Sequence, residues 1–306
     1  MSFVIYTLYI LFGLFIMYYF IKQIFRINFP YNCNCDCENF NYDNSDKKIN
    51  DVKVVTGFYI IGSKYSLEQY LSWIKNFMKL NMDVIIFVDQ QSYDLLSTLY
   101  PPKIDRIYKI VEIEDFEVSK YNWDYDLEID PEVEKGHSTN LYRVWAEKTF
   151  FLKKILNEYP ESQYLLWVDI GCFRFSDKQV TNEFKNFPLS HRFKHDKITM
   201  MQLIDFNKEE TKNVFNIDHR FLHVLRIGGS MFGGNRKSIE KWIDLYSKIL
   251  KEFKEKRLFA GKDESLYCFC ILQQPDLFDL VKPDPNILYE KWYQLHHHFS
   301  LKDKLK

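Results

Sequence analysis

The stretch QYLLWVDIGCFR, residues 163–174, decides the fold. Residues 164–168 are apolar or aromatic without a polar break, which is typical of a strand buried on both faces of its sheet. The run stops at Asp169 and Gly171, residue types that favour turns. A strand covered on both faces needs helices on both sides, so this stretch predicts the central strand of an α/β domain with a mostly parallel sheet.

Strand-like and helix-like segments alternate before this stretch. They are, in order, VKVVTGFYII (52–61), SLEQYLSWIKNFMKL (66–80), DVIIFVD (83–89), a short helical stretch, IDRIYKIVEI (104–113), an acidic and aromatic insertion, and a long helix from Thr139 to Glu158. Ser66 stands where the N-cap of the first helix should be. Such alternation predicts parallel strands that are joined by helices.

The order of elements changes after the central stretch. The segments there are KITMMQLIDF (197–206), HVLRIGGSMFGGN (223–235), a helix from Lys237 to roughly Lys256, a helix from Asp263 to Gln273, LFDLVKPD (277–284) and LYEKWYQLHHHFS (288–300). We interpret the first two and LFDLVKPD as strands, and the last segment as an aromatic, histidine-rich tail.

The N-terminus carries a candidate membrane anchor. No charged residue occurs from Phe3 to Ile21, and about 19 helical residues span the hydrocarbon layer of a bilayer. A cleaved signal peptide is the alternative, but the apolar run is longer than the usual signal core and has no basic leader. We predict a single-pass transmembrane helix over 1–25, a juxtamembrane linker over 26–51 and one globular domain over 52–306.

The residues that flank the anchor bear on its orientation. Lys22 and Arg26 follow the apolar run and nothing basic precedes it, which weakly favours a cytoplasmic position for the soluble domain. The linker holds Cys33, Cys35 and Cys37, whose alternate spacing does not match that of zinc ligands. S-acylation beside the membrane and plain unpaired thiols are both open interpretations.

The composition predicts a folded chain and excludes some functions. Of the 306 residues 46% are hydrophobic and 27% are charged, with a formal net charge of −1. Such a charge gives no broad positive field, so nucleic acid is not an expected partner. No Gly-x-Gly-x-x-Gly follows the first strand and no Walker lysine loop occurs, which argues against a dinucleotide oxidoreductase and a P-loop nucleotidase.

Asp169 is the first candidate for chemistry. Ligands of open α/β sheets lie beyond the carboxyl ends of the strands. A carboxylate at such an end can hold a divalent cation that bridges two phosphates. The alternative is an aspartate that caps the turn into the next segment.

Arg174 and Lys148 are candidate ligands of a diphosphate. A guanidinium matches phosphate oxygens with two parallel hydrogen bonds, although Arg174 could equally form a surface ion pair with Asp177. Lys148 and Trp145 lie three residues apart and therefore share one face of the long predicted helix. Lys148 could reach a diphosphate while Trp145 packs, or it could be a solvated lysine.

Three further features add candidates. The paired glycines of RIGGSMFGGN, residues 226–235, with Gly233 among them, suit a backbone that approaches a ligand closely or an ordinary bulge. Asp263 and Glu264 begin a predicted helix, where either carboxylate could act as acid or base or stabilise a positive, sugar-like transition state, although helix starts favour acidic residues anyway. His297 could join a divalent site, or it could belong to an exposed histidine run.

Several of these strings together resemble a known family. They are TGFYIIG (56–62), YLSWIKNFMKL (70–80), VIIFVD (84–89) and, above all, YLLWVDIGCFR (164–174). They are similar to the HtrL/YibB/WlaTC family of bacterial and viral proteins, which are regarded as probable glycosyltransferases. The resemblance covers most of the chain from Val54 onward. It implies a GT-A-like fold, a nucleotide-diphosphate sugar as donor, and Mn²⁺ or Mg²⁺.

The resemblance also assigns roles to residues. By that similarity Asp169 takes the place of the first aspartate of an Asp-x-Asp metal motif, MFGG (231–234) resembles the acceptor-side strand, and KDES (262–265) resembles the acidic pair near the sugar. Gly171 stands where the second aspartate would be. Either Asp169, water and a tail histidine hold the metal, or Arg174 and Lys148 balance the diphosphate without one.

The expected function is a membrane-anchored glycosyltransferase that moves a sugar from a nucleotide-diphosphate donor to a glycan, lipid or protein acceptor. Two alternatives stay open. A metal-dependent phosphohydrolase could use the same strand-end aspartate and would need no acceptor. A catalytically degenerate, membrane-bound binding protein of GT-A-like fold would tolerate Gly171.

Overall fold

The computed structural model describes residues 51–62, 64–212, 224–287 and 290–300. The predicted anchor over 1–25, nearly all of the linker over 26–51 and the three linker cysteines lie outside these ranges, so they stay predictions. Within the described ranges, no helix has both the length and the apolar character needed to cross a membrane.

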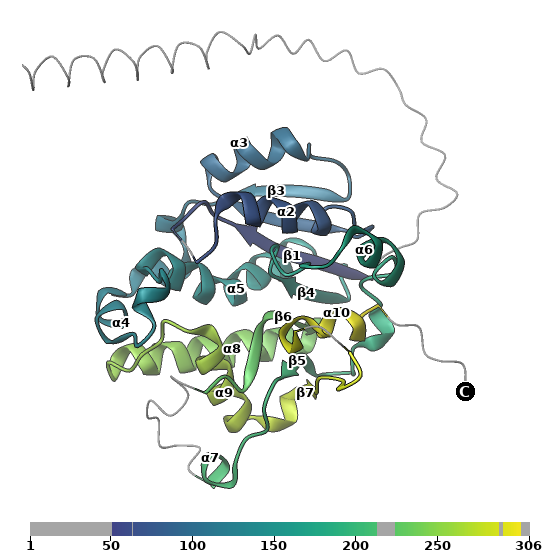
Figure 1. Cartoon of the computed structure of the whole chain (residues 1–306). Helices are drawn as coiled ribbons and strands as arrows, with labels where there is room; N and C mark the ends of the chain where they lie inside the picture. The colour runs from purple at the N-terminus through teal and green to yellow at the C-terminus, as the bar shows by residue number, and fades with distance from the viewer. Residues whose placement is uncertain (1–50, 63, 213–223, 288–289, 301–306) are drawn as a thin grey trace, which may run out of the picture. The chain divides into compact units, whose positions relative to one another are not determined.

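A seven-stranded sheet forms the centre of the domain (Figure 1). Its strands are β1 Val52–Phe58, β2 Val84–Val88, β3 Arg106–Ile110, β4 Tyr164–Val168, β5 Ile198–Gln202, β6 Ile227–Asn235 and β7 Phe278–Val281. They lie in the order β3-β2-β1-β4-β6-β5-β7. Only β6 runs antiparallel to its neighbours in this sheet. The prediction of a mixed, mostly parallel sheet with QYLLWVDIG as a central strand is confirmed.

Helices cover both faces of the sheet. Those of the described ranges are α2 Leu67–Phe77, α3 Gln90–Leu99, α4 Asp124–Ile129, α5 Thr139–Glu158, α6 Asp177–Glu183, α7 Lys208–Lys212, α8 Arg236–Glu255, α9 Asp263–Gln273 and α10 Leu295–His298. Residues of α5, α8 and α9 pack on one face, and residues of α2, α3 and α10 pack on the other. The bounds of α5 and α9 match the predicted ones, and Ser66 caps α2 as expected.

Side chains of β4 alternate between these two layers. Leu165 and Trp167 belong to the core on the α5 side, whereas Leu166 and Val168 belong to the core on the α2 side. This alternation follows from the two-residue period of a strand, and all four side chains are at most 2% exposed. The continuous apolar run is therefore explained by burial on both faces.

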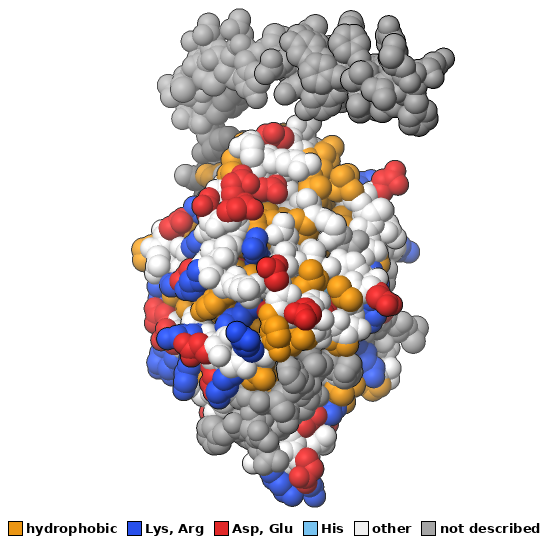
Figure 2. All heavy atoms as spheres, turned by 90° about the vertical axis from the view of Figure 1, so that its left-hand side faces the viewer, with side chains coloured by type: hydrophobic (Ala, Val, Ile, Leu, Met, Phe, Trp, Pro, Cys, Tyr) orange, Lys and Arg blue, Asp and Glu red, His pale blue; other side chains and the backbone are white. Residues whose placement is uncertain are grey.

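The surface carries charges of both signs. Figure 2 shows Lys and Arg side chains interspersed with Asp and Glu on the face that it draws. Such mixing gives that face no extended field of a single sign.

The histidine-rich tail is not an exposed run, which corrects one of the two interpretations above. His296 is fully buried and His297 is 9% exposed. The ring of His296 lies among aromatic side chains, with its Nε2 atom 3.1 Å from Cys172 Sγ. The tail is therefore part of the core that lies behind the loop after β4.

Gly233 yields a prediction about stability. A Cβ atom at this position would lie 2.3 Å from the carbonyl oxygen of Leu165 on β4. Because backbone cannot move aside cheaply, Gly233→Ala should lower the free energy of unfolding by about 3 kcal/mol. Thermal unfolding of the full chain in detergent would measure this, with Gly62→Ala as the control because no atom lies within 4 Å of its Cβ position. Equal melting temperatures for the two variants would contradict the packing of β4 on β6.

Candidate active site

An open cleft lies at the carboxyl ends of β1 and β4, which is where ligands of α/β sheets bind. Its lining comes from the segment after β1, the start of α2, the first half of α5, the loop after β4, β6 and the C-terminal segment. Asp169, Gly171, Arg174 and Lys148, four of the predicted site residues, all line this cleft.

Asp169 lies at the tip of β4 with its side chain 36% exposed. Its backbone N–H donates to the carbonyl oxygen of Ser230 on β6 at 2.7 Å. Trp167 Nε1 donates to Asp169 Oδ1, also at 2.7 Å. The carboxylate thus lines the cleft rather than capping a closed turn. Burial raises the pKa of Asp169, and the charge of Lys148 works against this shift.

Lys148 connects Asp169 to a second carboxylate. Its Nζ atom lies 3.0 Å from Asp169 Oδ1, 2.9 Å from Asp263 Oδ2 and 3.2 Å from the carbonyl oxygen of Gly229. An ammonium has three N–H donors, so these three acceptors account for all of them. Burial would lower the pKa of Lys148, but the two carboxylates outweigh it and raise that pKa. Lys148 is therefore a charged, 4% exposed link inside the protein, not a flexible arm that reaches for phosphate.

Asp263 and Glu264 stand in the first turn of α9. Asp263 accepts from Tyr267 on the same helix and is 5% exposed. Glu264 Oε1 accepts from the backbone N–H of Gly229 at 3.3 Å. A Cβ atom at Gly229 would lie 2.9 Å from Glu264 Cγ and 3.1 Å from Asp263 Oδ2. The acidic pair packs closely against β6 because β6 has a glycine at this point, but neither carboxylate is among the residues that line the cleft.

Arg174 is surrounded by aromatic rings. Its guanidinium carbon lies 3.8 Å from the ring centre of Trp73, 4.7 Å from that of Tyr65 and 5.0 Å from that of Tyr293. Its Nε donates to the carbonyl oxygen of Gly171 at 3.1 Å. Among the described residues, no carboxylate forms an ion pair with Arg174, and Asp177 pairs with Lys79 instead. The surface ion pair proposed as its alternative role is therefore wrong.

The remaining predicted site residues fall into two groups. Gly171 lines the cleft, where its Cβ position lies 3.2 Å from Tyr70. Gly233 does not line the cleft, and its close contact is with β4, so its expected role beside a ligand lacks support. His297 is also not among the cleft residues. It lies 3.6 Å from Glu183, with its ring against Phe184.

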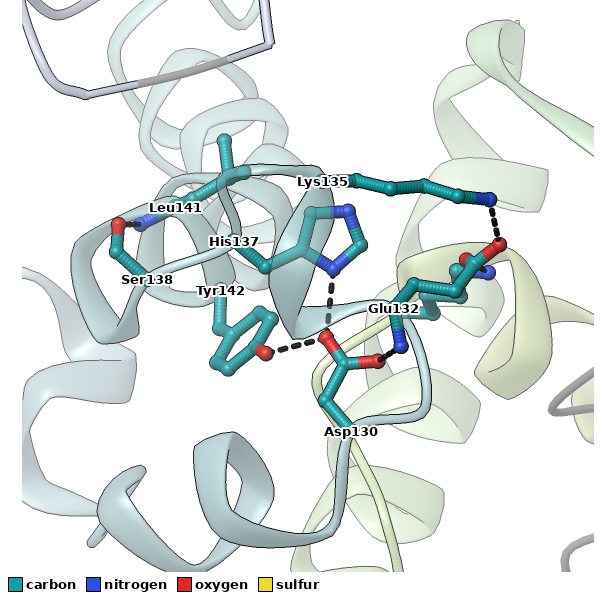
Figure 3. Close-up of polar contacts among 8 residues, drawn as sticks. Asp130, Glu132, Lys135, His137, Ser138, Leu141 and Tyr142 are labelled. Atoms are coloured by element: carbon teal, nitrogen blue, oxygen red, sulfur yellow. Dashed lines mark hydrogen bonds and ion pairs between the residues drawn. The ribbon is translucent and has the colours of Figure 1, made fainter.

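A polar cluster surrounds the buried carboxylate of Asp130 (Figure 3). Asp130 Oδ2 accepts from Tyr142 at 2.5 Å and lies 2.6 Å from His137 Nδ1, while Asp130 Oδ1 accepts from the backbone of Glu132 at 2.8 Å. Glu132 in turn forms an ion pair with Lys262, the residue before Asp263. Since Tyr142 belongs to α5, this cluster fixes the start of α9 relative to the helix that carries Lys148.

The residues present do not fit a resident divalent cation. The Asp169 carboxylate already accepts from Trp167 and Lys148. The ammonium of Lys148, 3.0 Å away, would repel a metal ion. Gly171 supplies no second carboxylate, and His297 lies elsewhere. In the described ranges, no three His, Cys, Asp or Glu side chains are grouped as metal ligands would be.

Sequence reasoning missed several residues of the site. Trp167 lies two residues before Asp169, so the period of a strand places both on one face and could have predicted the contact. Gly229 belongs to the paired glycines of residues 226–235, but nothing in the sequence indicated that Glu264 would pack against it. The aromatic rings around Arg174 had no signal at all. These contacts form only because α9, α2 and the tail pack there.

The pKa of Glu264 yields a prediction about pH. Burial, and then the charge of Asp263, raise the pKa of Glu264 from 4.5 to about 8. The folded chain therefore keeps a proton that the unfolded chain releases, and stability should fall as the pH rises from about 4.5 to about 8. The melting temperature of the Glu264→Gln variant should fall less between pH 5 and pH 9 than that of the wild type. Parallel curves of melting temperature against pH for the variant and the wild type would contradict the raised pKa of Glu264.

Asp130 yields a second prediction for this site. Its carboxylate is fully buried, so Asp130→Ala should leave Tyr142 without its acceptor and lower the free energy of unfolding by about 3 kcal/mol. Asp124→Ala on the exposed first turn of α4 is the matched control, with an expected change within about 0.5 kcal/mol. Chemical denaturation of the full chain would measure both. A change at Asp130 no larger than that of the control would contradict the role of the cluster.

Comparison with known proteins shows which family the chain belongs to. No curated protein matches it. Among solved structures, mouse Xyloside xylosyltransferase 1, apo form, aligns over 75% of this chain and 84% of its own, with 11% identity and a TM-score of 0.40, values too low to bear on activity. A family model described as "Bacterial protein of unknown function (HtrL_YibB)" matches residues 96–300. This match spans more than half of the chain and confirms the resemblance, so the protein belongs to the HtrL/YibB family.

Proposed function

We propose that this chain is a glycosyltransferase that takes a sugar from a nucleotide-diphosphate donor bound in the cleft at the end of β4. The observation that carries the proposal is the position of Asp169. Its partly exposed carboxylate lines the cleft at the carboxyl ends of β1 and β4, and Arg174 lines the same cleft. A GT-A-like way of binding the donor, and transfer to a glycan, lipid or protein acceptor, are further parts of the proposal.

The chemistry that the site must perform is the loss of a diphosphate. Breaking the bond between sugar and phosphate leaves negative charge on the departing group, so fixed positive charge beside that group lowers the barrier most. Arg174 is the residue for this task, because its guanidinium lines the cleft without a carboxylate partner among the described residues. Its aromatic neighbours hold it in place, so little reorganisation is needed when the diphosphate departs.

The acidic pair of α9 has a separate task. Glu264 lies in the first turn of α9 against β6, where burial raises its pKa to about 8. This raised pKa favours the protonated form of Glu264 near neutral pH. A carboxyl group in that state suits proton transfer to or from an acceptor hydroxyl. Asp263 forms an ion pair with Lys148 at 2.9 Å, and its task in the proposal is to hold Lys148 in place.

Membrane attachment is part of the same proposal. The support for it is the uncharged run from Phe3 to Ile21, which would tether the domain through the linker at 26–51 and direct it to a lipid-linked or surface-bound acceptor. The basic residues after the run favour a cytoplasmic position for the domain.

Asp169→Asn tests the proposed activity. The substitution keeps the shape of the side chain but removes the carboxylate that pairs with Lys148 and accepts from Trp167. The end of β4 then loses its fixed position, so release of nucleoside diphosphate from a nucleotide sugar should fall about 100-fold. The assay would screen a panel of nucleotide sugars with the full chain in detergent. Asp177→Asn is the control, because Asp177 is 70% exposed and pairs with Lys79.

Each outcome of this assay is informative. Wild-type turnover in the Asp169→Asn variant would contradict the role of the strand-end carboxylate. Release of inorganic phosphate without an acceptor would favour the phosphohydrolase. Binding of nucleotide sugars without turnover under any condition would favour a binding protein over an enzyme.

A further inference from the structure

Lys148 occupies the place of a bridging cation. In a site with two carboxylates, a positive charge that lies within contact distance of both holds them together and removes their mutual repulsion. The Nζ atom of Lys148 does this for Asp169 at 3.0 Å and Asp263 at 2.9 Å, and it adds the carbonyl oxygen of Gly229 at 3.2 Å as a third oxygen. The ammonium therefore has three oxygen neighbours that come from three different elements.

The surroundings of Lys148 keep it in this place. The residue is 4% exposed and lies on the long helix α5, whose side chains near it pack in the core. Its ammonium also lies 6.0 Å from the ring centre of Trp167. All three N–H groups have acceptors, so no hydrogen bond would be gained if the ammonium moved away. Its departure would leave the buried carboxylate of Asp263 without its ion-pair partner.

The charges of the cleft are balanced without an added ion. Among the described residues that line the cleft, Lys148 and Arg174 are the cations and Asp169 is the carboxylate. Asp263 lies outside this lining and is the second carboxylate within contact distance of Lys148. A divalent ion at Asp169 would have to lie beside the ammonium, where repulsion between like charges would oppose its binding. The ammonium of Lys148 is thus a fixed positive charge at the position where a metal ion would contact Asp169 and Asp263.

We propose that the ammonium of Lys148 is the built-in cation of this site, so that the cleft binds a nucleoside diphosphate without a divalent metal ion. This inference rests on the function proposed above. It assigns Lys148 as a positioning residue that acts through Asp169 and Asp263, and it leaves Arg174 as the group that contacts the diphosphate.

The substitution Lys148→Met tests the inference by a readout other than activity. It removes the ammonium while keeping an unbranched side chain, so Asp169 and Asp263 lose their shared cation. Titration with Mn²⁺ alone, followed by electron paramagnetic resonance, should show a bound ion in this variant with an affinity at least about tenfold above that of the wild type. Lys153→Met is the matched control, since Lys153 lies on the same helix but is 41% exposed and pairs with Glu117. Equal Mn²⁺ affinity in the wild type and the Lys148→Met variant would overturn the inference.

A second measurement needs no variant and therefore does not depend on how the variant folds. Calorimetric titration of the wild-type full chain with UDP, GDP and CDP would be done once with EDTA and once with Mn²⁺. The inference expects one of these nucleotides to bind with a dissociation constant that differs by no more than about twofold between the two conditions. Binding that needs Mn²⁺ would overturn the inference and leave the proposed function standing. If no nucleotide binds in either condition, the proposed function fails, and the Mn²⁺ titration of the variants still decides the role of Lys148.

Discussion

The ion-paired group of Asp169, Lys148 and Asp263 is the constraint on which the site depends. It joins the tip of β4 to α5 and to the start of α9 through contacts of 3.0 and 2.9 Å. An uncompensated charge in such a position costs several kcal/mol, of the order of 3 to 5, when one partner of a buried pair is lost. Lys148 and Asp263 are both buried. Moving β4, α5 or α9 out of place would break an ion pair and leave a charge without its partner.

The sheet topology explains how these elements come together. β4 lies next to β1 on one side and next to the antiparallel β6 on the other. The reversal at β6 brings its amino end, with Gly229 and Ser230, beside the carboxyl end of β4. At Gly229 the strand has no side chain, and the first turn of α9 fills the space. The same reversal that breaks the parallel pattern of the sheet thus builds one wall of the site.

The sequence allowed the central strand, its flanking helices and the strand-end aspartate to be predicted, because each depends on a local pattern. Burial on both faces makes β4 apolar throughout, and the local sequence predicted the bounds of α5 and α9. The partners of Lys148 could not be predicted, since its spacing on α5 says nothing of which carboxylates face it. For the same reason, the contacts of Arg174 with aromatic rings and of Glu264 with Gly229 were found only in the structure.

His297 and Gly233 show where such reasoning fails. A histidine run near a chain end is commonly exposed, but here aromatic side chains of the loop after β4 bury it. A glycine in a strand can approach a ligand or another strand, and Gly233 approaches Leu165 on β4. The residue type limits the roles that His297 and Gly233 can have. The tertiary contacts decide which of these roles each residue takes.

The central claim is that the end of β4 faces the phosphates of an activated sugar. A crystal structure of the full chain with a bound nucleoside diphosphate tests it most directly. The account predicts phosphate oxygens within hydrogen-bond distance of Arg174, beside the carboxylate of Asp169. A nucleotide that occupies another surface, with this cleft left unchanged at saturating concentration, would contradict it.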